Sequence, residues 1–156
     1  ELDEGSALLL NHVRNVQGRV LDFACGSGVL AATLMKRHKI KAATLSDISA
    51  LAVFASLLTL AANKLSATVM AADGLHGIDT TFDRIISNPP FHSGLKNDYS
   101  STENFIRQSA SILSKDGSLQ LVANRFLPYP DLLKQYFGGA ETLVKTNKFS
   151  VYQATK

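Results

Sequence analysis

The chain has 156 residues, of which 46% are hydrophobic and 19% charged, and it carries a net charge of +3. This composition excludes a disordered or low-complexity protein and fits one domain with its own core. The single cysteine, Cys25, excludes an internal disulfide, and the longest apolar stretch, residues 50–62, is too short to span a membrane. We therefore expect a cytoplasmic protein without a membrane partner, whose charge permits nucleic-acid binding without requiring it.

Helices and strands alternate in the predicted structure. In chain order, the pattern predicts a helix at 2–16, a strand at 19–23, a helix at 29–38, a strand at 41–45, a helix at 50–64, strands at 68–72 and 82–87, a helix at 101–113, a strand at 118–123, a helix at 130–137, and a terminal hairpin of 142–146 with 149–153. Asp3 and Ser6 are candidate caps of the first helix. The helix at 50–64 is apolar nearly all round, so we expect it to be buried between layers. The alternation predicts an α/β protein with a mostly parallel sheet and helices on both faces.

Candidate site residues follow four of the predicted strands. They are the run from Asp22 to Gly28, then Asp47, then Asp73 with Gly74, and finally the run from Asn88 to Phe91. Ligands of open parallel sheets bind at the carboxyl ends of the strands. The sequence therefore predicts one binding site at this edge of the sheet.

The first of these runs is a glycine turn between a strand and a helix. Gly26 and Gly28 remove side chains there, so a ligand can approach the backbone. The spacing also matches a dinucleotide-binding pattern, with Asp47 about 20 residues further on. A nicotinamide-dependent enzyme is therefore an alternative interpretation. Asp22 favours another ligand, because a carboxylate repels a pyrophosphate but attracts the cationic sulfonium and ammonium groups of S-adenosylmethionine.

Each aspartate also has a simpler interpretation. Asp22 could only accept hydrogen bonds from loop N–H groups, Asp47 could cap the following helix, and Asp73 could be a turn residue before Gly74. In the binding interpretation, Asp47 holds a ribose and Asp73 reads an adenine amino group. Cys25 is interpreted as a small neutral filler of the turn.

The run Asn88-Pro89-Pro90-Phe91 predicts an acceptor site for a planar amino group. The Asn88 side-chain oxygen and the Pro89 carbonyl can accept hydrogen bonds from an –NH2 group, and the prolines fix the backbone around them. Phe91 offers a face on which a base extruded from its stack could lie. The alternative is a rigid turn with a core phenylalanine. Together with Asp22, the run predicts methyl transfer to an amino nitrogen.

These motifs, in this order, resemble those of class I S-adenosylmethionine-dependent methyltransferases. More narrowly, three runs resemble the bacterial small-subunit ribosomal RNA guanine-N2 methyltransferase family: Leu-Asp-x-Gly-Ser at 2–6, Asn-Pro-Pro-Phe-His-Ser-Gly at 88–94 and Val-Ala-Asn-Arg-Phe-Leu-Pro-Tyr at 122–129. The resemblance covers essentially the whole chain. One departure is Ala24, at a position of the turn that is often glycine.

The resemblance implies a Rossmann-like, seven-stranded sheet whose last strand is reversed. It implies that residues 1–156 form a methyltransferase domain, the C-terminal part of a longer protein with a degenerate N-terminal copy as its partner. The substrate would be 16S rRNA, free or in the assembled 30S subunit, methylated at the N2 of a guanine. S-adenosylmethionine would be bound by Asp22, Ala24, Gly26, Gly28, Asp47, Ile48, Asp73, Gly74 and Asn88, and Asn88, Pro89, Pro90 and Phe91 would be catalytic. From the residues alone, Tyr99, Arg125 and Tyr129 could touch RNA, and a packing role is an equal interpretation of Tyr129.

Three other functions stay open. An Asn-Pro-Pro-aromatic loop suits any planar –NH2 group, so adenine N6 or a protein glutamine amide could be the acceptor. The domain could also bind RNA or cofactor without catalysing transfer, or it could be a nicotinamide dehydrogenase.

Overall fold

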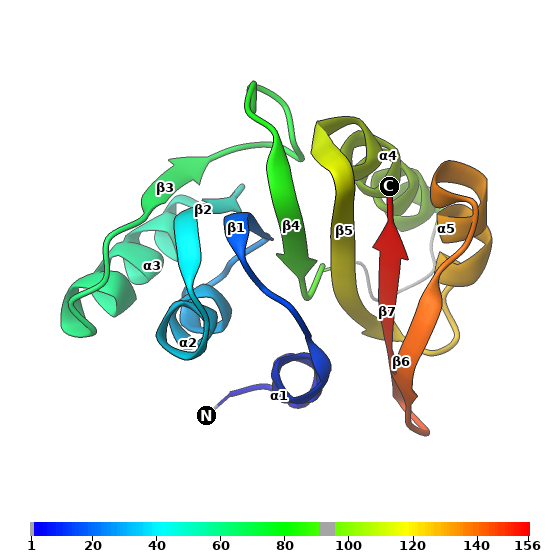
Figure 1. Ribbon diagram of the computed structural model, residues 1–156, viewed down its shortest axis with the longest axis horizontal. Coiled ribbons are helices and arrows are strands. Elements are labelled where there is room, and N and C mark those ends of the chain that lie inside the picture. The colour runs from blue at the N-terminus through cyan, green and yellow to red at the C-terminus, as the bar shows by residue number, and fades with distance from the viewer. Residues whose placement is uncertain (1, 91–95) are drawn as a thin grey trace.

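The computed structural model describes residues 2–90 and 96–156. Figure 1 shows a single sheet with helices on either side of it. The helices are α1 (Glu4–His12), α2 (Val29–Arg37), α3 (Ala50–Ala62), α4 (Lys96–Ile112) and α5 (Tyr129–Phe137). The strands are β1 (Gly18–Phe23), β2 (Ile40–Asp47), β3 (Thr68–Ala71), β4 (Phe82–Ser87), β5 (Leu113–Asn124), β6 (Glu141–Lys145) and β7 (Phe149–Thr155).

The seven strands lie in the order β3-β2-β1-β4-β5-β7-β6. Strands β1 to β5 pair in parallel, whereas β7 runs antiparallel to both β5 and β6. The mostly parallel sheet with a reversed last strand and a terminal hairpin is therefore confirmed. The chain first builds outward from β1 to β3 and then returns to add β4 on the other side of β1. This change of direction is the switch point at which such sheets bind ligands.

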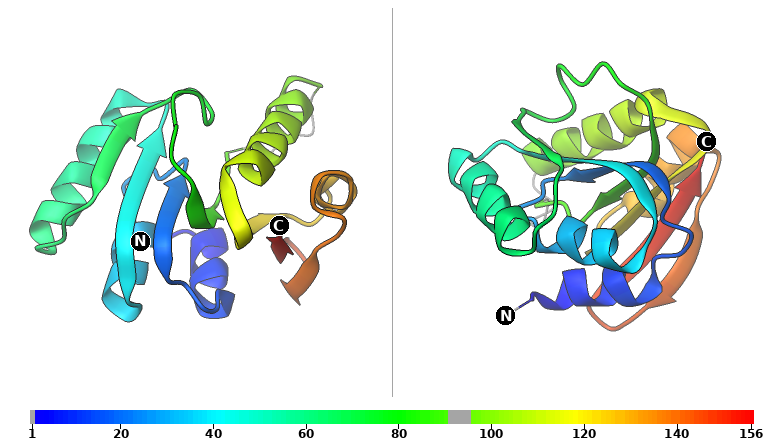
Figure 2. Two further views of the ribbon diagram at one scale, coloured as in Figure 1. Left: turned by 45° about the horizontal axis from the view of Figure 1, so that its top comes forward. Right: turned by 60° about the vertical axis from the view of Figure 1, so that its left-hand side comes forward.

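Successive side chains of the central strands enter two different cores. Leu21 of β1 and Ile85 of β4 belong to the core with α4 and α5, whereas Val20 and Ile86 belong to the core with α1 and α2. A third cluster joins α2 and α3 to β2. This alternation follows the two-residue period of a strand. Figure 2 shows the result, with α1, α2 and α3 on one face and α4 and α5 on the other.

Helix α3 differs from the expectation that it is buried between layers. Leu51, Phe54 and Leu58 are 76%, 59% and 56% exposed, and the buried residues of the helix are Ser56 and Leu60. The helix packs with one side against β2 and β3 at the edge of the sheet. Among the described residues no second layer covers its outer side. The prediction of burial was wrong because an all-apolar helix does not reveal which of its sides has a neighbour.

Several element boundaries also differ from the predicted ones. Helix α1 ends at His12, four residues earlier than expected, and α4 already begins at Lys96. The turn predicted at residues 115–117 is part of β5, where Asp116 has a φ of 64° and the register with β4 shifts. The remainder of the predicted polar loop, residues 92–95, lies outside the described residues. No helix in the described ranges combines the length and hydrophobicity that crossing a membrane requires.

Candidate active site

The carboxyl ends of the parallel strands are tied to one another by hydrogen bonds. The Ser87 hydroxyl at the end of β4 donates to the Phe23 carbonyl at the end of β1, at 2.8 Å. The Cys25 N–H then donates to the Ser46 carbonyl of β2, at 3.0 Å. These bonds hold the glycine turn between the ends of β2 and β4. The four groups of predicted site residues therefore meet at one edge of the sheet.

Two cavities open at this edge, and both are lined by Ala24, Gly26 and Asn88. The larger one, about 700 Å³, extends over the ends of β2 and β3 toward α4. The smaller one, about 230 Å³, lies between the glycine turn and the start of α1, and Asp3, Ser6 and Asp22 contribute to its wall. The two cavities thus share a border at the turn and at Asn88.

Most of the predicted site residues line one or both cavities: Asp22, Ala24, Gly26, Asp47, Ile48, Asp73, Gly74, Asn88 and Pro90. Two of them line neither. Pro89 is buried, and Gly28 is the N-cap of α2 with a φ of 74°, where a Cβ would come within 2.9 Å of the Ser56 hydroxyl. Gly28 is therefore required for packing against α3. Phe91 lies outside the described residues.

The glycine turn provides open space at its centre. Gly26 has a φ of 54°, and a Cβ built there meets nothing within 4 Å. The Ser56 hydroxyl of α3 donates to the Gly26 carbonyl at 2.8 Å, and this bond fixes the orientation of the peptide that follows Gly26. Ala24, where the resemblance favours glycine, also has a left-handed φ of 55°. The turn tolerates this alanine at a local cost of about 1 kcal/mol.

Asp22 is a buried carboxylate that is only half satisfied. Its side chain is 2% exposed, and Oδ2 accepts a hydrogen bond from the Ala31 N–H at 3.1 Å. Oδ1 is buried without a hydrogen-bond partner among the described residues. Burial raises the pKa of Asp22 to about 7; the Ala31 bond opposes this rise and the charge of Asp47 adds to it. A cationic group in the smaller cavity would compensate the unpaired oxygen.

Asp47 is satisfied within the protein. Its Oδ2 accepts from the Gly26 N–H and its Oδ1 accepts from the Ser49 N–H, each at 2.9 Å. Ser49 is itself the N-cap of α3 and accepts from the Ala52 N–H. The helix-capping interpretation of Asp47 therefore holds in part, because the side chain connects the glycine turn to the start of α3. Contact with a ribose stays a prediction.

Helix α4 supplies one wall of the larger cavity, and sequence reasoning missed it. Ser101, Asn104, Phe105 and Gln108 line the cavity, and the Phe105 ring stacks on Phe23 with centroids 4.2 Å apart. The Gln108 carbonyl oxygen accepts from the Leu75 N–H at 3.3 Å. These side chains are three and four residues apart, which places them on one helix face. This spacing was the signal in the sequence that could have identified them.

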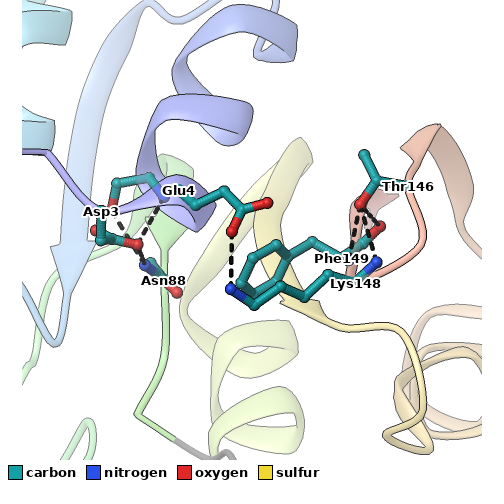
Figure 3. Close-up of polar contacts among 7 residues, drawn as sticks. Asp3, Glu4, Asn88, Thr146, Lys148 and Phe149 are labelled. Carbon is teal, nitrogen blue, oxygen red and sulfur yellow. Dashed lines mark hydrogen bonds and ion pairs between the residues drawn. The ribbon is translucent and has the colours of Figure 1, made fainter.

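Asn88 is held by the first helix. Its Nδ2 donates to Asp3 Oδ1 at 2.9 Å and lies 3.1 Å from the Ser6 hydroxyl, which also accepts from it. Figure 3 shows the side chains of Asp3 and Asn88 directed toward each other. Asp3 is the N-cap of α1, as expected, and accepts from the Ser6 N–H. Its second contact, with Asn88, was not foreseen from the sequence.

Other residues are less suited to chemistry. Burial raises the pKa of the Cys25 thiol to about 11, which keeps it neutral and agrees with its interpretation as a filler. Tyr129 is fully buried, which favours its interpretation as a packing residue over RNA contact. Phe126 is 80% exposed, with the Arg125 guanidinium 5.6 Å from its ring centre. No group of potential metal ligands occurs among the residues that the structure describes.

Known proteins share this sequence and this arrangement. Two relatives named ribosomal RNA small subunit methyltransferase C, from Alteromonas mediterranea and Photorhabdus laumondii, are 50% and 51% identical to the chain. The alignments cover 99% and 100% of this chain but 43% and 46% of those proteins. The chain thus spans less than half the length of these relatives.

A solved structure is also similar to this chain. The T. thermophilus 16S rRNA N2 G1207 methyltransferase, in complex with AdoMet and guanosine, superposes with a TM-score of 0.86 at 30% identity, over 100% of this chain and 44% of that one. Residues 1–153 also match the family model described as the methyltransferase small domain. Since this match covers nearly all residues, the chain belongs to the methyltransferase small domain family.

Proposed function

We propose that this chain is the catalytic domain of a 16S rRNA guanine-N2 methyltransferase that uses S-adenosylmethionine. The observation that carries the proposal is the meeting of two cavities at Asn88, one of them containing the half-satisfied carboxylate of Asp22. The names of the relatives and of the T. thermophilus structure, with guanine 1207 as its target, support the choice of substrate.

The residues present fit the cofactor. S-adenosylmethionine supplies a methyl group on a cationic sulfur, together with an ammonium group and an adenosine. The buried, unpaired oxygen of Asp22 suits a cationic group in the smaller cavity. Open space at Gly26 admits a ligand against the backbone, and Asp47, Ile48, Asp73 and Gly74 line the cavity that has room for an adenosine.

In this proposal Asn88 orients the acceptor. The Asn88 side-chain oxygen accepts a hydrogen bond from the guanine amino group. A second bond, to the Pro89 carbonyl, stays a prediction, since Pro89 is buried and lines neither cavity. These bonds draw the nitrogen lone pair out of conjugation with the ring and stabilise the positive charge that develops on nitrogen. Fixing the nucleophile in line with the methyl group supplies most of the remaining rate enhancement, so no strong base is required.

The rest of a longer protein would complete the substrate site. We infer that residues 1–156 are the methyl-transfer domain and that a further, N-terminal domain helps to capture rRNA or the assembled small subunit. The partial coverage of both relatives supports this division. The exposed Arg125 and Phe126, which follow the end of β5, are suited to contact RNA near the site.

The test is the identity of the methylated product. The intact protein is incubated with labelled S-adenosylmethionine and, in parallel, with 16S rRNA, assembled small subunits, DNA and a peptide-release factor. We expect label in rRNA, recovered as N2-methylguanosine by mass spectrometry of nucleosides. Recovery of N6-methyladenosine or methylglutamine instead would overturn the choice of acceptor, and absence of transfer to all four would overturn the enzymatic assignment.

A further inference from the structure

The Leu-Asp-x-Gly-Ser run at residues 2–6 contributes to the wall of the smaller cavity, and three of its residues also converge on one side chain. Asp3 and Ser6 accept hydrogen bonds from Asn88 Nδ2, at 2.9 and 3.1 Å. A Cβ added to Gly5 would lie 3.2 Å from Asp3 Oδ1 and 3.3 Å from Asn88 Nδ2. The absence of a side chain at Gly5 thus permits the close approach of β4's end to α1.

The chemistry of Asp3 determines which way the Asn88 carboxamide faces. A carboxylate only accepts hydrogen bonds, so the nitrogen of the amide must turn toward it. Partial burial works against ionisation, but the hydrogen bonds from Ser6 and Asn88 prevail and hold the pKa of Asp3 below its usual value. Asp3 is therefore an ionised acceptor at neutral pH. Because the nitrogen of the carboxamide faces Asp3, its oxygen is the atom left to accept a further hydrogen bond, and it lies 3.5 Å from the position that a Gly5 Cβ would take.

The orientation matters for an amino acceptor. If the carboxamide were rotated by half a turn, its own –NH2 group would face the –NH2 group of the acceptor, and two donors would meet. An amide with no fixed neighbours would populate both orientations. The contact with Asp3 removes the unproductive one before an acceptor arrives.

We propose that Asp3, Gly5 and Ser6 are positioning residues that fix the Asn88 carboxamide with its oxygen toward the acceptor amine. This role rests on the proposed function, because it needs an amino group as the acceptor. It extends the catalytic unit from the end of β4 to the start of α1, which lies 85 positions away in the chain.

A substitution that keeps the helix cap separates positioning from folding. In the intact protein, Asp3→Ser retains a good N-cap for α1, but serine is too short to reach Asn88. We expect kcat, measured at saturating S-adenosylmethionine, to fall about 10- to 100-fold, as for loss of one oriented hydrogen bond in the transition state. The KM for S-adenosylmethionine should rise as well, because Asp3 also lines the smaller cavity. Glu4→Gln is the matched control, since Glu4 is exposed and its carboxylate pairs with Lys148 at 2.7 Å, and among the described residues it makes no contact with Asn88. This control should keep wild-type kcat.

A double-variant comparison tests whether Asp3 acts through Asn88. In an Asn88→Ala background, Asp3→Ser should lower kcat no further, because there is no carboxamide left to orient. An additional loss of the same size in that background would show a purely structural or cofactor-binding role for Asp3, and would overturn the proposal.

Exchanging the two groups gives a rescue test. Asn88→Asp alone sets two carboxylates against each other and should lower kcat about 100-fold or more. Asp3→Asn combined with Asn88→Asp restores one hydrogen-bond donor and one hydrogen-bond acceptor in the contact. It also leaves an oxygen of residue 88 facing the amine that is to be methylated. We expect the exchange to recover at least about tenfold of the lost kcat. A combined variant no more active than Asn88→Asp would count against the orientation.

An NMR measurement keeps this proposal distinct from the proposed function. The Asn88 side-chain –NH2 signals should be shifted and slow to exchange in the wild type and in Glu4→Gln, and should become averaged in Asp3→Ser. Unchanged signals in Asp3→Ser would overturn the positioning role even if methyl transfer occurs. Protected signals in a protein that transfers no methyl group would confirm the orientation while the proposed function fails.

Discussion

The two cavities at the edge of the sheet differ in how their polar groups are satisfied. In the larger one, both Asp47 oxygens already accept hydrogen bonds from the backbone, and stacked aromatic rings form part of the wall. In the smaller one, Asp22 keeps one buried oxygen without a partner among the described residues. The first cavity can therefore select a ligand by its shape and through Asp73, whereas the second requires a ligand that brings positive charge.

The border between the cavities differs from both of them in how its polar side chain is bound. Asn88 lines both of them, and its nitrogen is already bound to Asp3 and Ser6. Within the described part of the chain, its oxygen has no hydrogen-bond partner and is the group that it can offer to a ligand. Shape recognition, charge recognition and acceptor orientation are thus assigned to different residues, and substitutions should separate them.

The largest effect is expected at the border. Asn88→Ala removes the acceptor oxygen, so kcat should fall about 100- to 1,000-fold, as for loss of one preorganised group in other active sites. Because the cavity walls persist, the Kd for S-adenosylmethionine, measured by calorimetry, should stay within about threefold of the wild type. Full turnover on the ribosomal substrate would contradict the role of this side chain.

The smaller cavity should lose charge recognition when Asp22 becomes neutral. Asp22→Asn is expected to raise the Kd for S-adenosylmethionine about 10- to 100-fold. The same change should stabilise the free protein by on the order of 2 kcal/mol at pH 8, since a buried charge with an unpaired oxygen is removed. Calorimetry measures the change in affinity, and urea unfolding measures the change in stability. Weaker binding together with higher stability identifies Asp22 as a binding group, whereas a loss of both would identify it as a structural group.

The pH dependence sharpens the same contrast. The raised pKa of about 7 means that free Asp22 is largely protonated below neutral pH, whereas a bound cation favours the carboxylate. Affinity should therefore fall by up to about tenfold for each pH unit below 7. For the free protein, the free energy of unfolding that Asp22 contributes should decrease as pH rises from about 4 toward 7, because the folded state retains the proton longer. Asp22→Asn should show neither slope.

The larger cavity should respond more weakly to loss of the Asp47 carboxylate. Asp47→Ala leaves the Gly26 and Ser49 N–H groups without their acceptor. We expect a loss of about 1–3 kcal/mol in the free energy of unfolding and a rise of about tenfold in the Kd for S-adenosylmethionine. If affinity fell more than in Asp22→Asn, Asp47 and not Asp22 would be the carboxylate that contributes most to cofactor binding.

The smallest effect is expected at Ala24, which lines both cavities. Ala24→Gly relieves the left-handed φ of 55° but increases the freedom of the unfolded chain, and the two terms nearly cancel. Thermal unfolding should show a change in stability of less than about 1 kcal/mol, with cofactor affinity preserved. A large loss of affinity would instead assign the alanine methyl group a direct contact with the ligand.

Much of the fold and of the site wall could be predicted from local sequence. Short apolar runs ending in Asp22, Asp47 and Asn88 identify strand ends, and parallel strands bring such ends to one edge. The terminal hairpin follows from two alternating segments separated by Asn147 and Lys148. These features depend on neighbouring residues, so periodicity and turn chemistry were sufficient for them.

Features that depend on distant contacts could not be predicted in the same way. The outer side of α3 is exposed because nothing described packs on it, which the composition of the helix does not reveal. Gly28 belongs to the motif for packing reasons, since Ser56 of α3 occupies the space behind it. Asp3 could be identified as a cap, but its contact with Asn88 requires the position of α1 relative to β4.

That contact has a consequence for the order in which function appears during refolding. A bond between partners 85 positions apart forms only after the intervening chain has closed a long loop. The wall of the larger cavity comes from strands, turns and α4, which can assemble before α1 docks, whereas the smaller cavity also needs Asp3 and Ser6 at the start of α1. After dilution from denaturant, recovery of adenosine binding should therefore precede recovery of turnover, with a lag that lengthens when the docking of α1 is slowed.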